Sequence, residues 1–302
     1  MVRAVTIVCL ILSLAGCKLG SGPMSEEGAP TRVSTASTDP RVAKEVFGHI
    51  PTPTTGDSQS VGSYARGCQA GAVALPETGA TWQAMRLSRN RNWGQPRLVA
   101  FLTDLSAFAA TQPGWSGLYL GDMSQPRGGP MLTGHASHQI GLDADIWLLP
   151  ADRLNLSASE RENISSARMD HTDGAYVNDN WTPAHEAIIR RAAEDPRVAR
   201  IFIFPGAKVE MCRNATGDRT WLNKVRPWFG HNYHFHVRLN CDPSDPACEP
   251  QSPPPDGDGC ADAEQWVRDI LNPPPPPANP APARGPLTMG ELPDMCSAVA
   301  NE

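Results

Sequence analysis

The chain has 302 residues, 40% of them hydrophobic, and these values are ordinary for a globular protein with a sizeable core. The formal net charge at pH 7 is −6 and no stretch forms a basic stripe, so composition argues against a nucleic-acid-binding protein, and no nucleic-acid partner is expected. The 30 prolines and 26 glycines predict many loops.

The N-terminal residues are typical of an export signal. Arg3 precedes an apolar run over residues 4–15, which is too short to span a membrane as a mature helix. The run ends in Leu-Ala-Gly-Cys and resembles a bacterial lipoprotein signal, so we expect a signal peptide at residues 1–16 and a lipidated Cys17. Lys18 favours anchoring in the inner leaflet of the outer membrane of a Gram-negative bacterium, facing the periplasm. The alternative is an ordinary secretory signal with a chance cysteine.

Composition changes mark the domain boundaries. Residues 18–45 are rich in Ser, Gly, Thr and Pro, and residues 46–67 are loop-like, so we expect a flexible tether at 17–56 and one folded domain at 57–302. That domain includes a proline-rich, extended tail at about 271–290.

Periodicity and capping residues predict helices and strands in alternation. Helices are expected at 83–87, 96–110, 157–168 (helix or loop), 182–193 and 220–225, and strands at 117–122, 142–149, 200–205 and 231–240. Thr182 and Pro183 are a helix N-cap and first position. Because these elements lack a regular β-α-β order, they predict an α+β fold with a small central antiparallel sheet and flanking helices.

Six cysteines remain after the signal peptide and Cys17 are set aside, and an even number in an exported protein predicts disulfides. They are Cys68, Cys212, Cys241, Cys248, Cys260 and Cys296. Cys241 and Cys248 flank a turn and are expected to pair; the other pairings stay open. The competing interpretation, metal binding by cysteine, is disfavoured because no Cys-x-x-Cys occurs.

Histidines mark the most informative strand. In residues 231–240 polar and apolar residues alternate strictly, which is the pattern of a half-buried strand. His234 and His236 therefore point the same way, and Phe235 and Val237 point to the core.

A second cluster, residues 135–145, contains His135, His138, Asp143 and Asp145. Histidines and carboxylates gathered in this way are the ligands of a hydrolytic zinc site. Asp145 follows His138 by seven positions, so the two would face opposite ways on one straight strand, and Gly141 is a natural place for a bend. His236 completes a set of three ligands that leaves a position for water.

Zinc at this site would lower the pKa of its water toward ~7 and polarise a carbonyl oxygen, and amide hydrolysis also needs a general base. His231 and His234 are the candidates for base and electrophilic helper, in either order. His135 is a fourth ligand, an orienting residue or a plain loop residue. Asp143 is either a hydrogen-bond acceptor beside the ligands or a structural residue.

Other polar and aromatic residues carry weaker signals. Asp122 ends an expected strand and could approach the site, although a turn aspartate is favoured. Asp170, His171 and Asp173 could bind a second ion, although an exposed loop is favoured. Trp221, Trp228 and Phe229 line a groove or belong to the core. The zincin motif His-Glu-x-x-His and a Gly-x-Ser-x-Gly elbow are absent from the sequence.

The combined motifs resemble the penicillin-insensitive murein endopeptidases, a family in the LAS group of zinc peptidases. Residues 134–146, 224–231 and 231–239 carry the resemblance, which extends from about residue 61 to 296. It implies a LAS-type metallopeptidase fold with His138, Asp145 and His236 as zinc ligands, His135 as a position sometimes assigned to metal, and His231 and His234 as catalytic. It also implies the disulfides Cys68–Cys296, Cys212–Cys260 and Cys241–Cys248.

The implied activity is a zinc-dependent D,D-endopeptidase that cleaves D-alanyl–meso-diaminopimelyl cross-links in peptidoglycan. Two departures stand out: the lipoprotein signal, where the family is soluble and periplasmic, and Tyr176, where a histidine of a secondary metal position is expected. We therefore expect a single zinc ion. The alternatives are a D,D- or L,D-carboxypeptidase on stem peptides and a non-catalytic lipoprotein that binds peptidoglycan or zinc.

Overall fold

The computed structural model describes residues 38–276 and 284–302. The expected signal peptide, Cys17 and most of the expected tether lie outside these residues. Within them, no helix combines the length and the apolar character needed to cross a membrane.

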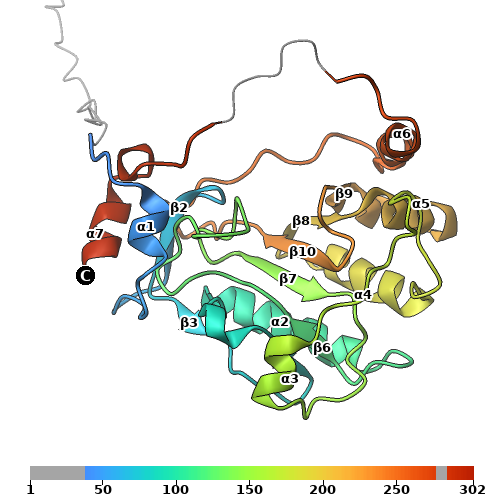
Figure 1. Cartoon of the computed structure of the whole chain (residues 1–302), viewed down its shortest axis with the longest axis horizontal. Coiled ribbons are helices and arrows are strands. Elements are labelled where there is room, and N and C mark those ends of the chain that lie inside the picture. The colour runs from blue at the N-terminus through green and yellow to red at the C-terminus, as the bar shows by residue number, and fades with distance from the viewer. Residues whose placement is uncertain (1–37, 277–283) are drawn as a thin grey trace, which may run out of the picture. The chain divides into compact units, whose positions relative to one another are not determined.

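A six-stranded sheet forms the centre of the domain (Figure 1). Its strands, in spatial order, are β4 (Trp82–Ala84), β6 (Leu118–Leu120), β7 (Asp143–Trp147), β10 (His234–Leu239), β8 (Val198–Ile203) and β9 (Val225–Pro227). The inner pairs β6–β7, β7–β10 and β10–β8 are antiparallel, whereas the edge pairs β4–β6 and β8–β9 are parallel. The predicted α+β class and central antiparallel sheet are confirmed, and the parallel edge pairs were not predicted.

Seven helices and two small hairpin-like pairs complete the described part of the chain. The helices are α1 (Ala43–Phe47), α2 (Pro96–Ala109), α3 (Ala158–Asn163), α4 (Pro183–Glu194), α5 (Pro205–Asn214), α6 (Cys260–Leu271) and α7 (Met295–Asn301). The small pairs are β1 (Gln59–Ser63) with β2 (Arg66–Ala70), and β3 (Val73–Ala74) with β5 (Trp93–Gly94). The predicted helices at 96–110 and 182–193 are confirmed as α2 and α4.

The main core lies on the face of the sheet opposite the histidines. Phe235, Val237 and Leu239 of β10 belong to it, together with Leu98 and Phe101 of α2 and Ile188 and Ile189 of α4. The strict alternation of β10 therefore places its apolar side chains against α2 and α4, and leaves the other face to His234, His236 and Arg238.

Two local expectations are wrong. Residues 83–87, expected as a helix, enter strand β4 and then a 3-10 turn at Leu87–Arg89. The window is too short for helical spacing to be decisive, and parallel pairing of Gln83 with Tyr119 of β6 overrides it. Residues 46–67, expected as a loop, contain β1 and the start of β2.

The described end of the expected tether belongs to the folded body. Ala43 and Phe47 of α1 are buried in a second apolar cluster with Met289, Leu292 and Cys296 from the C-terminal segment. Helices α1 and α7 accordingly lie side by side at one end of the domain (Figure 1).

Three disulfides connect these parts, with the pairing that the family resemblance implied. Cys68–Cys296 joins β2 to α7, Cys212–Cys260 joins α5 to α6, and Cys241–Cys248 closes the turn after β10. The first spans 228 positions and the second 48, so both restrict the unfolded chain over long loops.

Candidate active site

Neighbouring strands bring the two histidine clusters together. His236 of β10 lies directly opposite Asp145 of β7 in the antiparallel register. The loop before β7 carries His135 and His138 back over the same face. Its backbone turns at His138 (φ 66°) and Gly141 (φ 73°), so the bend predicted at Gly141 is confirmed. A Cβ at Gly141 would lie 1.8 Å from Gln69 Oε1, which restricts this position to glycine.

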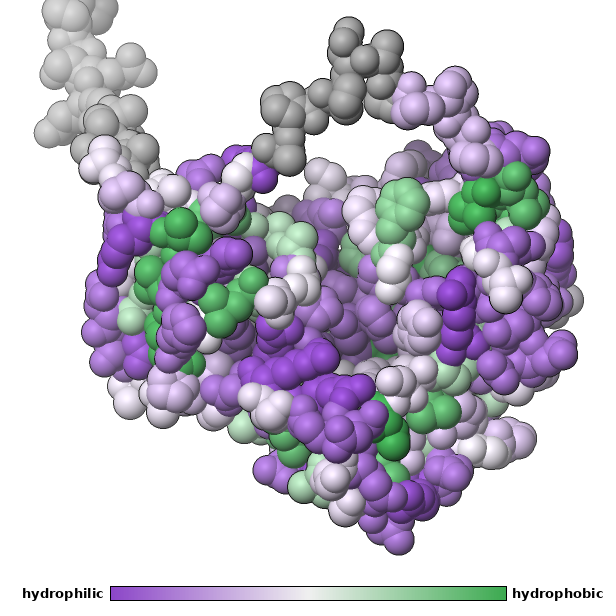
Figure 2. All heavy atoms as spheres, in the orientation of Figure 1, coloured by the Kyte–Doolittle hydropathy of each residue, from purple (hydrophilic) through white to green (hydrophobic). Residues whose placement is uncertain are grey.

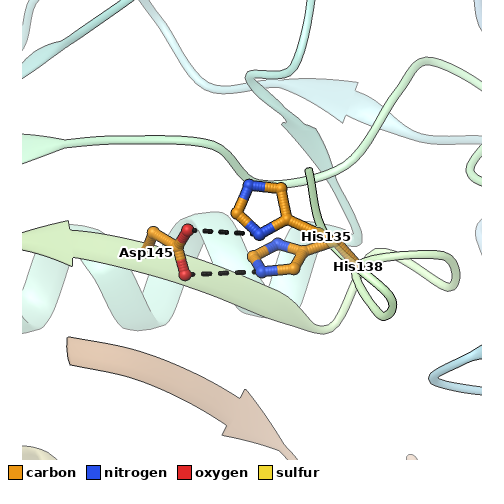
Figure 3. A group of neighbouring side chains, drawn as sticks. All are labelled: His135, His138 and Asp145. Carbon is orange, nitrogen blue, oxygen red and sulfur yellow. Dashed lines mark ion pairs between the residues drawn. The ribbon is translucent and has the colours of Figure 1, made fainter. Parts of the chain in front are cut away.

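Three ligand atoms converge at Asp145. His138 Nε2 lies 3.4 Å from Asp145 Oδ1, and His236 Nδ1 lies 3.5 Å from the same oxygen. All three side chains are buried. Figure 3 shows how His138, together with His135, points from its loop toward the carboxylate on β7.

Hydrogen bonding fixes the tautomer of His138. Its Nδ1 is 2.6 Å from the carbonyl oxygen of Met123, which only accepts, so Nδ1 carries a proton, and in the neutral ring Nε2 carries the lone pair. Burial lowers the pKa of His138, but the Asp145 carboxylate outweighs burial and raises it, so a bound cation would take the place of a second proton on Nε2. His138 Nε2 and Asp145 Oδ1 are buried and find no hydrogen-bond partner among the described residues. Two acceptor atoms that face each other in a buried position fit a shared cation, which is the arrangement of metal ligands.

Asp143 holds both histidine ligands. It accepts the backbone N–H of His138 at 3.0 Å and both guanidinium N–H groups of Arg238, at 2.8 and 3.2 Å. His236 Nε2 lies 3.0 Å from Asp143 Oδ1, close but off the hydrogen-bond direction. Burial opposes the charge of Asp143, but Arg238 and His236 outweigh it and hold the pKa of Asp143 well below its usual range. Asp143 therefore stays ionised and accepts hydrogen bonds beside His138 and His236, which is one of the two predicted possibilities.

His135 and Asp122 form the outer part of the cluster. His135 Nε2 is 3.1 Å from Asp122 Oδ2, and His135 Nδ1 is 3.5 Å from Asp145 Oδ2. His135, His138 and Asp145 therefore also form a group of possible ligand atoms within 4.8 Å of one another. His236 is not in this group, but its Nδ1 approaches the same Asp145 oxygen as His138 Nε2.

Asp122 approaches the histidine cluster, which is the alternative that the sequence leaves open beside a turn role. Its carboxylate accepts from Arg89 at 3.0 Å and Arg91 at 2.9 Å, besides His135. Burial would raise the pKa of Asp122, but the His135 hydrogen bond and the two guanidinium groups lower it to about 2. The Gly-Asp-Met turn at 121–123 was the only sequence signal for this role.

His231 and His234 lie beside the ligands, nearer the surface. The ring centroids of His231 and His234 are 4.9 Å apart, and those of His231 and His236 are 5.9 Å apart. His231 Nδ1 donates to the carbonyl oxygen of Phe229 at 2.6 Å, which leaves Nε2 as the acceptor. His234 Nε2 lies 3.4 Å from Asp145 Oδ2.

Both of these histidines are held neutral. Burial, followed by the neighbouring imidazoles of His234 and His236, lowers the pKa of His231 to about 3. Burial also lowers the pKa of His234, against the attraction of Asp145. At neutral pH each ring therefore has one nitrogen that can accept a proton.

A cavity of ≈470 Å³ opens over the cluster. It is lined by Arg86, Arg89, Gly121, Asp122, His135, Asp145, Trp147, Ser165, Ser166, Tyr233 and His234. Figure 2 shows the hollow between the surface over α1 and α7 and the surface over α5 and α6, with hydrophilic residues along most of it. The polar lining and the open mouth are suited to an extended polar substrate.

The remaining predicted residues separate into structural and exposed groups. Asp170, expected in an exposed loop, is buried: it accepts from Arg168 and from Asn232, the neighbour of His231, and so supports the loop that carries His231. Trp221 is in the core, whereas Trp228 and Phe229 are 52% and 72% exposed.

Comparison with known proteins connects this geometry to one family. The sequence profile described as "Penicillin-insensitive murein endopeptidase" matches residues 60–301. Proteins with that name are similar over most of the chain: 43% identical in Haemophilus influenzae over 70% of this chain and 74% of the relative, and 41% identical in Klebsiella pneumoniae over 84% and 90%. A third, from Yersinia pestis, is 42% identical over 86% of this chain and 92% of the relative. The chain belongs to the penicillin-insensitive murein endopeptidase family of peptidases.

Proposed function

We propose that the protein is a zinc-dependent D,D-endopeptidase that hydrolyses D-alanyl–meso-diaminopimelyl cross-links in peptidoglycan. Membership of a murein endopeptidase family makes peptidoglycan the substrate and the cell wall the place of action. The observation that carries the finer proposal is the pair of buried acceptors, His138 Nε2 and Asp145 Oδ1, beside two neutral histidines.

The residues present fit a catalytic zinc ion. His138 Nε2, the Asp145 carboxylate and His236 Nδ1 would hold it, and two imidazoles with one carboxylate are a common catalytic set. Bound zinc supplies a Lewis acid that polarises a carbonyl and makes water nucleophilic near neutral pH. The hydrogen bond to Asp122 occupies Nε2 of His135 and leaves its Nδ1 facing Asp145, so His135 is either a further ligand through Nδ1 or a residue that orients the ligands.

The two half-buried histidines, His231 and His234, divide the proton chemistry in this proposal. His231 is the better base, since its Nδ1–H is fixed on the Phe229 carbonyl and its Nε2 lone pair is available to take a proton from water. His234 is placed to stabilise charge on the substrate carbonyl oxygen by donating a hydrogen bond. The proton on His231 then passes to the leaving amine. No serine is acylated in this scheme, so β-lactams would not block it.

Digestion of isolated sacculi tests the proposal. The zinc-loaded protein is expected to convert cross-linked muropeptide dimers to monomers, and a chelator and His236→Ala are each expected to abolish the conversion. Release of free D-alanine without loss of dimers would instead identify a carboxypeptidase. Zinc binding without turnover of any muropeptide would identify a non-catalytic protein.

We also propose that the enzyme acts from the inner leaflet of the outer membrane, anchored in the periplasm through lipidated Cys17. The support is the Leu-Ala-Gly-Cys sequence at residues 14–17, which lies outside the described residues. Cys17→Ser is expected to move the protein from the membrane fraction to the soluble periplasmic fraction. Full membrane retention of that variant would exclude the lipid anchor.

A further inference from the structure

A second cavity, of ≈510 Å³, adjoins the active site. His135 lines both this cavity and the one above the ligand cluster, so the two cavities are neighbours with His135 between them. The second cavity is lined by Lys44, Ser63, Ala65, Arg66, Pro130, His135, Ala136, Gln139, Arg284, Pro286 and Leu287. Its lining contains three cationic side chains and no carboxylate, and we call it the basic pocket.

Two of the three cations are uncompensated. Within residues 38–276 and 284–302, no ion pair or side-chain hydrogen bond engages the side chain of Lys44 or Arg66. Arg284 is different, because it pairs with Glu291 at 3.1 Å. Lys44 and Arg66 therefore give the basic pocket a net positive charge that no described residue neutralises.

The chain segments that carry these cations are held in place. Arg66 pairs with Ser63 at the closed end of the β1–β2 hairpin. Gln139 Nε2 donates to the carbonyls of Ala65 and Ala136, at 3.0 and 3.1 Å, and so ties that hairpin to the His135 loop. The position of Arg66 relative to the active site is therefore set by the fold.

Lys44 is fixed by the C-terminal segment. The backbone N–H of Ala43 donates to Leu287 at 2.8 Å, and Cys68–Cys296 fastens α7 to β2 beside α1 (Figure 1). The apolar residues Pro130, Pro286 and Leu287 wall the pocket and lower its dielectric constant. A ligand anion would meet positioned charges, which reduces the entropic cost of binding.

We propose that the basic pocket binds a free carboxylate of the cross-linked peptide, through Lys44 and Arg66. This rests on the proposed function. The diaminopimelyl residue of the cross-link carries a free carboxylate on the carbon bonded to the scissile nitrogen, so an anionic subsite next to the catalytic cluster matches that side of the bond. The subsite selects a peptide whose carboxylate is unmodified over one whose carboxylate is an amide.

Paired substrates test the subsite. The rates of cleavage of a muropeptide dimer with the free carboxylate and of the same dimer with that group amidated are measured for the zinc-loaded wild type, Lys44→Gln and Arg66→Gln. The wild type is expected to prefer the free carboxylate. Each variant should lose about tenfold in kcat/KM on that dimer, mainly through KM, since a charge-assisted hydrogen bond is lost. On the amidated dimer, variants and wild type should be equal.

Three further variants serve as controls. Lys44→Arg should restore the preference, and Arg284→Gln should lose less than Arg66→Gln because Arg284 is already paired with Glu291. Arg190→Gln changes a cation of α4, paired with Glu194, that does not line the basic pocket, and should match the wild type on both substrates. Thermal unfolding of each variant confirms that it folds.

The outcomes separate the two proposals. A wild type that cleaves both dimers, with Lys44→Gln and Arg66→Gln either unchanged or reduced equally on both, overturns the subsite alone. Inhibition by inorganic phosphate that both variants relieve supports the subsite, and inhibition that neither variant changes counts against it. A wild type that cleaves neither dimer overturns the proposed endopeptidase function, and the subsite with it.

Discussion

The two sides of the active site are built differently. The ligand side, His138 and Asp145 with His236, is buried, and each histidine contacts Asp143 or a backbone carbonyl. The other side, His231 and His234, lies where β10 begins, and the imidazole of His231 has one hydrogen bond among the described residues, to the Phe229 carbonyl. Metal ligands need fixed positions, whereas a base needs a free lone pair and access to water. The difference in burial therefore follows the difference in chemistry.

The ligand side carries the largest predicted effect. Asp145→Asn keeps the shape of the side chain but removes the charge that His135, His138, His234 and His236 all face. We expect loss of bound zinc and a fall in kcat of about a thousandfold or more. Metal analysis of the purified variant, with muropeptide digestion, measures both. An active, zinc-loaded Asp145→Asn would remove this residue from the ligand set.

Substitutions of His231 and His234, on the opposite side, should separate zinc binding from catalysis. His231→Ala is expected to keep its zinc and lose about 10²- to 10⁴-fold in kcat, because only the base is removed. Added imidazole should restore part of the rate. His234→Ala is the matched comparison: a larger loss of kcat there than at His231, with rescue only at His234, would exchange the two roles.

Asp143 tests whether the ligand side depends on its supporting contacts. Asp143→Asn keeps one acceptor oxygen but removes the charge shared by Arg238 and His236. Loss of such a contact weakens metal affinity by about 10- to 100-fold, so the variant should lose zinc to a competing chelator that the wild type resists. Kcat at saturating zinc should change much less. Equal zinc affinity in the two proteins would show that the ligands hold their positions without Asp143.

The sequence predicts those parts of the site that depend on a local pattern of residues. The alternation within the expected strand at 231–240 is a local signal that is confirmed over residues 234–239, while residues 231–233 precede the strand. The glycine between His138 and Asp145 is a second local signal, and the bend there is confirmed. The sequence favoured a turn role for Asp122 because its partners, Arg89 and Arg91, lie on another segment, and no residue near 122 in the sequence indicates that they are close. The basic pocket escaped notice for a similar reason: Lys44 and Arg66 meet only because the C-terminal segment holds α1 against the hairpin.

The smallest predicted effect is on the pH dependence of the free energy of unfolding of the zinc-free protein, and it arises from the protonation of His231. The pKa of His231 is about 3 in the folded protein, against ~6.5 in the unfolded chain. Between these values the unfolded state binds the extra proton, so the contribution of neutral His231 is fully present above pH ~6.5 and is lost as pH falls toward 3. His231→Ala should therefore lose less stability than the wild type between pH 7 and 4, by a small margin because the residue is only partly buried and solvent screens part of the effect. Urea unfolding at several pH values, with both proteins stripped of zinc, measures the difference. Parallel curves for the two proteins would mean that solvent reaches His231 freely and that burial does not hold it neutral.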